Sequence, residues 1–401
     1  MTRVADVIVV GAGPAGAATA ILLAEHGLAV TVLERVRRSR PKICGEYLSP
    51  EAGRVLDRLG ALKAVDAGGA VALAGMRITA PDGTVLAARY GVVGGFRPYR
   101  EHAIGVSRAT LDGALLDRVR ALPVDLREGV RVTDVVVEDG RVVGVLGADA
   151  GGARVEARAR VVVAADGRAS AVAHALGCRH PHPLARMALV TYVAGVPDCR
   201  DVGEIFVDPP DYAILNPVAP DRVNMSIVVP LAHGAAFSER LDAFFVARVK
   251  QLRHLARRVA GTTIATRVRA LGPLAYRVAP PAVGGVLLVG DAAGFYDPFT
   301  GEGVFTGLRS AELAAETATA ALRSGDCSVA ALHAHTRAHH AVFAGKERLT
   351  HALQLLIRHR RVANLAAHAL ARSPALLDVV LGAIGDFVPP GALLDPRRLR
   401  A

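Results

Sequence analysis

Two glycine-rich turns, separated by about 280 residues, constrain the fold of this chain more than any other feature. The first, GAGPAG at 11–16, directly follows the apolar run 6–10, and the second, within 290–303, follows the apolar run 286–289. In open α/β sheets, ligands bind at the carboxyl ends of such strands. The pair therefore predicts one nucleotide site that is assembled from two distant parts of the chain.

Each glycine of the first turn has a geometric reason. Gly11 allows the tight turn, Gly13 lets a pyrophosphate approach the backbone, and Gly16 lets the next helix pack on the strand. The following segment, 17–26, favours a helix whose N-terminus would face the phosphates. This unit predicts a dinucleotide site and does not by itself separate FAD from NAD.

A carboxylate for the ribose follows at the expected spacing. The second apolar run, 29–33, ends at Glu34, which lies 23 residues after Gly11. An acid at this position favours an unphosphorylated ribose, as in FAD or NAD.

Two further apolar runs end in acidic turns. The run 160–165 ends at Asp166, and the run 286–289 ends at Gly290 and Asp291, ahead of a helix expected from 304 to 322. This order sets an acceptor beside ribityl hydroxyls and aims helix amides at an electron-rich ring. Reduced flavin carries negative charge near N1, which such amides stabilise. These segments favour FAD over NAD.

The motifs resemble those of the flavoprotein superfamily that includes single-component aromatic hydroxylases and geranylgeranyl reductases. The resemblance covers roughly residues 1 to 330 and rests on four segments: GAGPAG with Glu34, SRATLD at 107–112, AADGRAS at 164–170, and GDAAGFYDPFTGEG at 290–303. It implies that Arg108 contacts FAD phosphate or ribose, that Asp166 lies near the pyrophosphate, and that Asp291 binds ribityl oxygens. The implied FAD-binding residues are Gly11, Gly13, Pro14, Ala15, Gly16, Glu34, Arg35, Cys44, Gly45, Arg108, Asp166, Gly290, Asp291, Pro298, Gly301, Glu302 and Gly303.

The segment 41–50, PKICGEYLSP, is similar to the Cys-Gly segment of the geranylgeranyl reductase branch. The resemblance places Cys44 near the flavin as the one candidate catalytic group, since the flavin itself carries the chemistry. Halogenase relatives carry a similar Gly-Glu element, but their Trp-rich signature cannot occur in a chain that has no Trp.

We expect an α/β fold with a doubly wound, Rossmann-like FAD-binding domain, an antiparallel substrate sheet and a C-terminal helical cap. The expected FAD-binding domain is discontinuous, 1–75, 101–175 and 274–330; the substrate domain is 76–100 and 176–273; the cap is 331–401. Strands of the substrate sheet are predicted at 187–193, 202–207, 212–217 and 223–229.

The strand 212–217 lies where geranylgeranyl reductases show an aromatic pattern that lines a lipid pocket. Tyr212 and Pro217 match this pattern, whereas Ile214 and Asn216 replace aromatics. Asn216 would suit recognition of a hydroxylated ring, or would serve turn formation. The candidate pocket residues are Tyr47, Tyr99, His102, Tyr212, Asn216, Pro217 and Phe299. His102 is either a catalytic base or an ordinary structural histidine.

The segment 333–361 contains six His, six Lys or Arg and one acid, Glu347. Helical spacing places one group of apolar residues on a common face: Val342, Leu349, Leu353 and Leu356. That face either packs on the FAD-binding domain, which we expect, or touches an anionic membrane as a peripheral contact. The His-rich part, 333–340, has no nearby carboxylate or Cys, so we expect no metal site.

Composition limits the other partners. The net charge is +11, but aromatics make up 4% and Trp is absent, which argues against a nucleic-acid partner. No run of ~18 uncharged apolar residues occurs, so no spanning helix is expected. Four cysteines without CxxC pairing indicate reduced thiols in a cytoplasmic protein. A cytoplasmic protein of this kind can also associate with a membrane through the segment 333–361.

Three functions fit these observations. The first is an FAD-dependent monooxygenase that uses NAD(P)H, bound transiently, and O₂ to hydroxylate a lipophilic aromatic or polyketide-like molecule. The second is a flavoenzyme that reduces C=C bonds of a prenyl or other lipophilic substrate. The third is an FAD electron-transfer protein without its own small substrate. The sequence leaves the substrate and the oligomeric state open.

Overall fold

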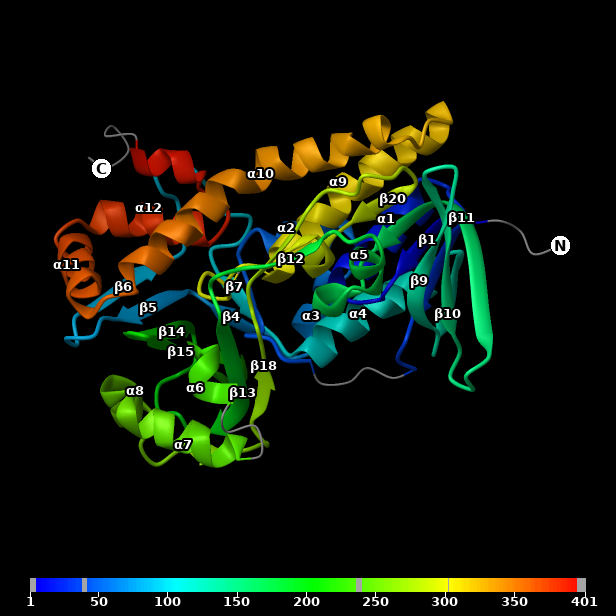
Figure 1. Ribbon diagram of the computed structural model, residues 1–401. Coiled ribbons are helices and arrows are strands. Elements are labelled where there is room, and N and C mark those ends of the chain that lie inside the picture. Colours follow the sequence, from blue (N-terminus) through cyan, green and yellow to red (C-terminus); the bar gives the residue numbers. More distant parts are fainter. Residues whose placement is uncertain (1–4, 38–41, 236–239, 302, 395–401) are drawn as a thin grey trace.

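The structure is a computed structural model that describes residues 5–37, 42–235, 240–301 and 303–394 (Figure 1). Two large sheets and a layer of C-terminal helices make up the molecule. Of the FAD-binding residues expected from the sequence, Glu302 lies outside the described residues.

The first sheet has a parallel core. Its strands lie in the order β8 (Val124–Glu128), β2 (Val30–Glu34), β1 (Ala5–Val10), β11 (Arg154–Ala164) and β20 (Val286–Leu288). β9 (Arg131–Glu138) and β10 (Arg141–Ala148) extend it antiparallel along the first half of β11. The apolar run at the N-terminus is thus an interior strand, as parallel sheets covered on both faces require.

Helices cover both faces of this sheet, which confirms the doubly wound fold. On one face, α1 (Pro14–Glu25) packs against α4 (Arg108–Arg120) and α9 (Gly303–Ser324). On the other, α5 (Ala171–Ala175) contacts β9. Side chains of β1 alternate between the two layers, with Val7 and Val9 in one apolar cluster and Ile8 and Val10 in the other. Because β1 and β20 run parallel, the glycine-rich turns that follow them lie at the same edge of the sheet.

The second sheet has eight strands, and the four strands predicted for it are confirmed. Its order is β17 (Thr263–Ile264), β13 (Arg186–Ala194), β16 (Arg222–Pro230), β15 (Asp211–Ala219), β14 (Val202–Asp208), β5 (Gly75–Thr79) and β6 (Val85–Arg89), with β18 (Arg269–Leu271) also on β13. All pairs are antiparallel except β14 with β5.

The two faces of the second sheet pack against different layers. Leu189 and Val193 of β13 lie in a cluster with Phe245 of α7 (Leu241–Gln251) and Leu255 of α8 (Arg253–Arg258). Ala188 of the same strand lies in the cluster on the opposite face, with Phe299 and Ile357. This two-residue alternation gives the sheet one supporting face and one face available for a site.

Shorter elements connect the two sheets. A three-stranded sheet of β3 (Tyr47–Leu48), β7 (Ala103–Gly105) and β4 (Val71–Leu73) adjoins α2 (Ala52–Arg58) and α3 (Leu62–Ala67). β12 (Arg179–Pro181) pairs with β19 (Tyr276–Val278), and α6 (Leu231–Ala235) follows β16.

The C-terminal part is helical, as expected: α10 (Val329–Leu356), α11 (Arg360–Ala371) and α12 (Pro374–Ile384). α10 runs along α9, while α11 and α12 pack on β6 (Figure 1). No single helix among the described residues is long and apolar enough to cross a membrane; α11 and α12 reach that threshold only jointly, with a bend of 112° between them.

The expected packing face of α10 is wrong in part. Val342 and Leu356 are exposed, and the buried positions include Lys346 and Gln354 instead. Lys346 Nζ donates to the carbonyl of Ala383 at 2.7 Å, at the end of α12. Because the last carbonyls of a helix need donors, a lysine here is more favourable than an apolar side chain.

Candidate active site

One cavity of about 790 Å³ extends from both glycine-rich turns to the inner face of the second sheet. The structure brings most of the expected site residues to its wall: Gly11, Gly13, Pro14, Ala15, Glu34, Arg35, Cys44, Gly45, Tyr47, Arg108, Asp166, Asn216, Gly290, Asp291, Pro298, Phe299, Gly301 and Gly303. Its size is within the usual range for small-molecule and cofactor sites.

The three glycines of the first turn have different surroundings. A Cβ on Gly11, whose φ is +96°, would lie 2.6 Å from the carbonyl oxygen of Ala165, and one on Gly16 would lie 1.9 Å from that of Gly11. A Cβ on Gly13 would meet nothing closer than Lys42 Nζ, at 3.7 Å. Gly11 and Gly16 therefore allow close packing, with Gly16 behind the cavity wall, while Gly13 keeps space open at the N-terminus of α1.

Glu34 holds this turn in place. Its carboxylate accepts hydrogen bonds from the amide of Ala12 at 2.8 Å and from that of Val36 at 3.0 Å. Each carboxylate oxygen retains a second lone pair for a ligand hydroxyl. The arrangement fits a ribose beside the turn.

Two carboxylates of the cavity wall have oxygens that no described residue donates to. Asp166 Oδ2 accepts from the amide of Ala171 at 2.7 Å, but its buried Oδ1 has no partner among the described residues. No described residue donates to the carboxylate of Asp291. Burial raises the pKa of both groups, and Arg108 and Arg168 oppose the rise at Asp291. Unpartnered acceptors beside an open turn fit a ligand rich in hydroxyls, such as FAD.

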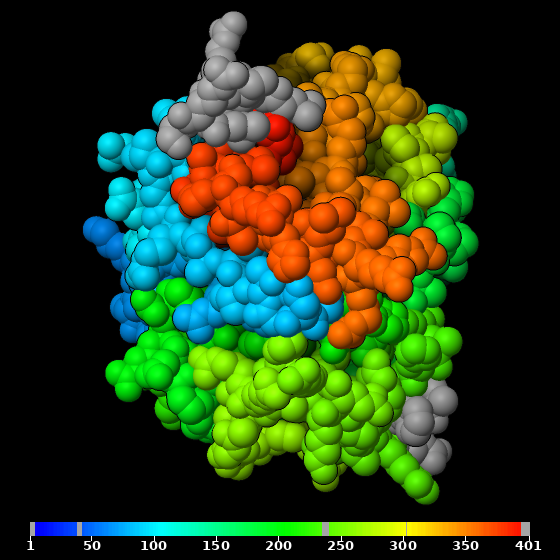
Figure 2. Space-filling view, turned by 90° about the vertical axis from the view of Figure 1, so that its left-hand side faces the viewer, coloured from blue at the N-terminus to red at the C-terminus, as the bar shows by residue number. Residues whose placement is uncertain are grey.

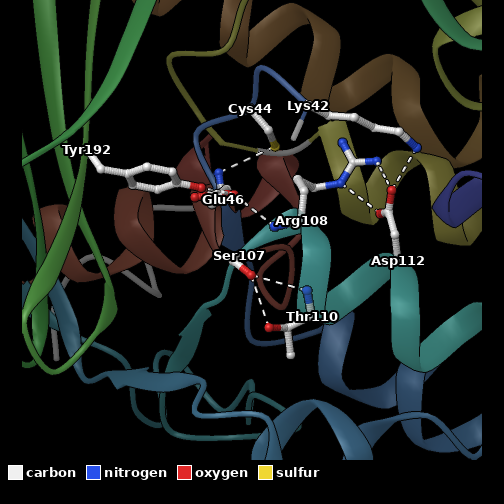
Figure 3. A network of polar contacts seen from close by, with 8 residues as sticks. All are labelled: Lys42, Cys44, Glu46, Ser107, Arg108, Thr110, Asp112 and Tyr192. Atoms are coloured by element: carbon white, nitrogen blue, oxygen red, sulfur yellow. Dashed lines mark hydrogen bonds and ion pairs between the residues drawn. The ribbon is translucent and has the colours of Figure 1, made fainter. Parts of the chain in front are cut away.

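A cationic group lies at the centre of the site (Figure 3). The guanidinium of Arg108 donates to Asp112 through Nε at 2.9 Å and Nη2 at 3.1 Å, and Lys42 Nζ lies 2.6 Å from Asp112 Oδ2. The thiol of Cys44 lies beside the same arginine. Burial raises the pKa of Cys44 and the charge of Arg108 partly offsets this, so Cys44 is a neutral thiol at neutral pH.

The second sheet holds the loop that carries Cys44. Asn216 Nδ2 donates to the carbonyls of Gly45, at 3.1 Å, and Glu46, at 2.8 Å. Asn224 Nδ2 donates to the carbonyl of Cys44 at 2.9 Å and to Glu46 Oε2 at 3.0 Å. Two strands of the second sheet, β15 and β16, thus fix this loop.

Glu46 connects the same loop to two further elements. Its Oε1 accepts from the Tyr192 hydroxyl of β13 at 2.7 Å and from the amide of Arg108, the first residue of α4, at 2.8 Å (Figure 3). Glu46 is buried, and its φ of 55° is rare for a residue with a side chain. Such a conformation persists only where the surroundings over-determine it.

The part of the cavity beneath the second sheet is apolar. Its lining side chains are Met76, Ala188, Val190, Ile205, Ile214, Val228, Leu271, Leu274, Phe295, Phe299 and Ile384. The polar groups there bond to protein, since Ser226 Oγ donates to Asn224 Oδ1 at 2.9 Å and the Tyr47 hydroxyl lies 2.5 Å from that of Tyr90. No carboxylate or imidazole occurs among the described lining residues from β13 to β16. We call this part the apolar chamber.

Four expected pocket residues lie off the cavity. Tyr99 is exposed and its hydroxyl donates to Asp57 at 2.6 Å. His102 contacts the carbonyl of the next residue, and Pro217 packs on β7. Tyr212 is wholly buried behind the wall: its hydroxyl donates to Asp297 Oδ1 at 2.6 Å and its ring meets Phe299 edge-on. The sequence placed these four residues near the cavity, but it did not show which way their side chains point.

Sequence reasoning missed the residues that hold the Cys44 loop: Glu46, Tyr192 and Asn224. Glu46 follows the Cys-Gly pair directly, so its place next to the motif was a usable signal. Nothing in the sequence marks Tyr192 or Asn224, because their partners lie 146 and 178 residues away.

The model of the FAD binding domain family matches residues 4–348. This chain belongs to that family. It is an FAD-dependent oxidoreductase, and the cofactor that the cavity fits is FAD.

Curated relatives and solved structures share this fold. The chain is 28% identical over 338 residues to a digeranylgeranylglycerophospholipid reductase of Methanosarcina acetivorans, covering 82% of this chain and 78% of the relative. It is 30% identical over 336 residues to digeranylgeranylglycerophospholipid reductase 2 of Methanopyrus kandleri, covering 82% and 80%. The flavin-dependent brominase Bmp2 superposes with a TM-score of 0.82 at 20% identity, covering 98% of each chain. PqsL, a probable FAD-dependent monooxygenase from Pseudomonas aeruginosa, does so at 0.73 and 22%, covering 92% of this chain and all of PqsL.

Proposed function

We propose that this oxidoreductase is a monooxygenase that hydroxylates a lipophilic aromatic or polyketide-like small molecule. The observation that carries the proposal is the apolar chamber, which has no acid or imidazole among its described lining residues from β13 to β16. The chamber opens from the part of the cavity that the two glycine-rich turns line, which we call the cradle. The balanced reaction inserts one oxygen atom of O₂ into a C–H bond and releases the other as water, with NAD(P)H and one proton consumed.

The residues of the cradle would hold FAD as follows. The turn at Gly13 and the N-terminus of α1 would take the pyrophosphate, and Glu34 the ribose. Asp291 would accept from ribityl hydroxyls, and the 298–303 loop would flank the ring. When bound, FAD supplies the redox chemistry, taking a hydride from a transiently bound nicotinamide and passing the electrons to oxygen. The apolar side chains of the chamber would exclude water from this reaction and bind the apolar substrate.

Cys44 favours a second candidate, reduction of a C=C bond in a prenyl or other lipophilic substrate. In that reaction a hydride adds to one alkene carbon and a proton to the other, with NAD(P)H and one proton consumed. The proton could come from Cys44, because its thiol lines the cavity and its raised pKa keeps it protonated. The names of the archaeal relatives support this alternative.

An electron-transfer protein without a small substrate is supported least. Such a protein needs an exposed flavin edge for its partner. In our proposal the ring lies beside the 298–303 loop, next to the apolar chamber under the second sheet, and that position suits a small molecule.

Oxygen dependence tests these proposals. The FAD-loaded protein is incubated with NADH or NADPH and with a long-chain alkylphenol or geranylgeraniol, in air and under argon. A product one oxygen atom heavier, formed only in air, supports hydroxylation. Equal product yield under argon excludes it.

The same assay distinguishes the alternatives. A product two hydrogen atoms heavier, formed in air and argon and lost in Cys44→Ala, supports C=C reduction with a role for the thiol. Oxidation of the nicotinamide without any change in either probe, but with reduction of an added electron carrier, supports electron transfer.

A further inference from the structure

The end of α10 has its polar and apolar faces reversed relative to an ordinary surface helix. Thr350 and Gln354 are buried, while Leu355 and Leu356 are 65% and 37% exposed. Gln354 faces inward because its Nε2 donates to the buried carboxylate of Asp297 at 2.7 Å. Ordinary surface helices place apolar residues inward, so these leucines need another explanation.

α11 continues the exposed apolar surface. Val362 and Leu365, three residues apart and hence on one side of the helix, are 40% and 71% exposed. The opposite side is packed, with Ala363 and Ala367 buried. Figure 2 shows α11, in orange-red, lying across this face of the molecule above the β5–β6 hairpin. We call the surface formed by Leu355, Leu356, Val362 and Leu365 the leucine corner.

The chain segment that forms the leucine corner carries charge of one sign. From Arg348 to Leu377 the chain contains five Arg and three His and no Asp or Glu. Arg358 and Arg361 lie between the exposed leucines, are exposed themselves, and form no ion pair among the described residues. Arg360 differs, since it pairs with Asp208. The corner therefore combines apolar side chains with cations whose charge is not neutralised.

The inner side of the same corner packs against the chamber wall. Ile357, between the exposed leucines and Arg358, is buried in one apolar cluster with Leu274 and Phe299, both of which line the chamber. Ala363 of α11 belongs to the same cluster. A single helical corner thus separates the chamber from the exposed leucines.

We propose that the leucine corner docks on an anionic lipid bilayer, with the leucines among the acyl chains and Arg358 and Arg361 at the headgroups. Interfacial helices have this combination of a basic polar face and Leu-rich apolar face. α11 has 12 residues, about 18 Å at 1.5 Å per residue, which is too short to span a core of about 30 Å. The corner therefore lies on the membrane and does not cross it.

A second copy of the chain fits this surface less well. A two-fold contact would bring the corner of one copy against the same corner of the other. That places Arg358 and Arg361 of both copies together, and no acid from 348 to 377 is present to pair with them. Charge complementarity therefore favours a phospholipid surface.

The proposed docking surface is inferred only from the exposure of its apolar side chains and from the charge of Arg358 and Arg361. Its use is a consequence that rests on the proposed function: a lipophilic substrate would pass from the bilayer into the chamber next to Ile357. The experiment below measures vesicle binding without turnover, so its failure is separable from a failure of the proposed reaction.

Co-sedimentation with vesicles tests the proposal. The FAD-loaded full chain is spun with phosphatidylcholine vesicles that contain or lack phosphatidylglycerol. We expect binding to the anionic vesicles that weakens as salt increases, because salt screens exposed charges. The double variant Leu355→Ser/Leu365→Ser should bind at least about tenfold more weakly. Arg358→Glu/Arg361→Glu should weaken binding by about fivefold per residue or more.

Matched controls use residues at the opposite end of the molecule (Figure 1). Val137→Ser removes an apolar side chain of β9 that is 46% exposed, and Arg154→Glu reverses an exposed arginine of β11. Both should bind vesicles like the unchanged protein, and all variants should retain FAD. Absence of binding to anionic vesicles, or equal binding by the leucine variant, overturns the proposal. A dimer in solution that the leucine variant loses would assign the corner to a second copy instead.

Discussion

The side-chain amide of Asn216 lies 2.8 Å from the carbonyl oxygen of Glu46, so a strand of the second sheet holds the loop that carries Cys44. The position of the Cys44 thiol is therefore determined by the sheet that covers the chamber. The same contact changes the interpretation of why Asn216 is polar. Its amide donates to the loop carbonyls, which removes the sequence-based reason for a hydroxylated ring beside it.

Asn216→Leu should destabilise the protein by about 1–3 kcal/mol, because the part-buried carbonyl of Gly45 loses its donor and the buried carbonyl of Glu46 loses one of two donors. Urea unfolding measures the loss. The matched control is Asn364→Leu, since the amide of Asn364 makes an exposed contact with Asp82 and should cost less than about 0.5 kcal/mol. Equal losses in the two variants would contradict an anchoring role for Asn216.

Two alanine substitutions in the first turn should differ in their effect on the stability of the FAD-free protein. Gly16→Ala places a methyl group 1.9 Å from the Gly11 carbonyl oxygen, so it should destabilise the FAD-free protein by about 1–3 kcal/mol or more. Gly13→Ala meets only Lys42 Nζ at 3.7 Å and should leave that stability within about 0.5 kcal/mol.

The same pair separates packing from cofactor binding. Gly13→Ala should weaken FAD binding by about tenfold or more, because the methyl group takes the space of the pyrophosphate. Fluorescence titration of FAD into the FAD-free protein measures this. Unchanged FAD affinity in Gly13→Ala would mean that the pyrophosphate does not lie at this turn.

The parts of the fold that follow from local sequence were predictable. β1, the first turn and the helix after it are specified by residues within a few positions of one another, and so are the alternating strands from β13 to β16. The long helix α9 was predicted within two residues at each end. Local patterns of this kind determine where helices, strands and turns form and which of their faces are buried, and these together determine the fold.

The inward face of α10 could not be predicted in this way. A helical pattern assumes that apolar residues face inward, but Lys346 and Gln354 are held by groups 37 and 57 residues away. Asn216 is a similar case, since its partners lie 170 and 171 residues away. A polar residue in the sequence shows that a partner is needed but does not identify the partner.

Cys44 should react slowly with iodoacetamide at neutral pH in the FAD-free protein. Its pKa is raised above the ordinary 9.0 by burial, so the reactive thiolate is below about 1% at pH 7. Arg108 lowers this pKa, so Arg108→Gln should raise it further and slow the reaction at any given pH below it.

Peptide mass spectrometry after timed alkylation from pH 7 to pH 10 follows Cys44 separately from the other cysteines. Arg54→Gln, which removes a cation paired with Glu312 instead, serves as the control. Faster alkylation of Cys44 in Arg108→Gln would show that the arginine does not stabilise the thiolate.

His339 should make the protein less stable in acid. Burial, with His335 and His340 nearby, lowers its pKa from 6.5 to about 4 in the folded protein. Between these values the unfolded chain binds more protons, so the stabilisation is complete above pH 6.5 and is lost as the pH falls toward 4. At pH 5 the loss relative to pH 7.5 is about 2 kcal/mol.

Urea unfolding at pH 5, 6 and 7.5 measures this dependence. His339→Gln should reduce the change in unfolding free energy between pH 7.5 and pH 5 by about 2 kcal/mol, because glutamine does not titrate. His359→Gln, at an exposed position, reports any general effect of removing a histidine. An unchanged pH dependence in His339→Gln would mean that other groups bind the protons, and that the packing of His339 on Phe343, with ring centroids 4.6 Å apart, tolerates a charged imidazole.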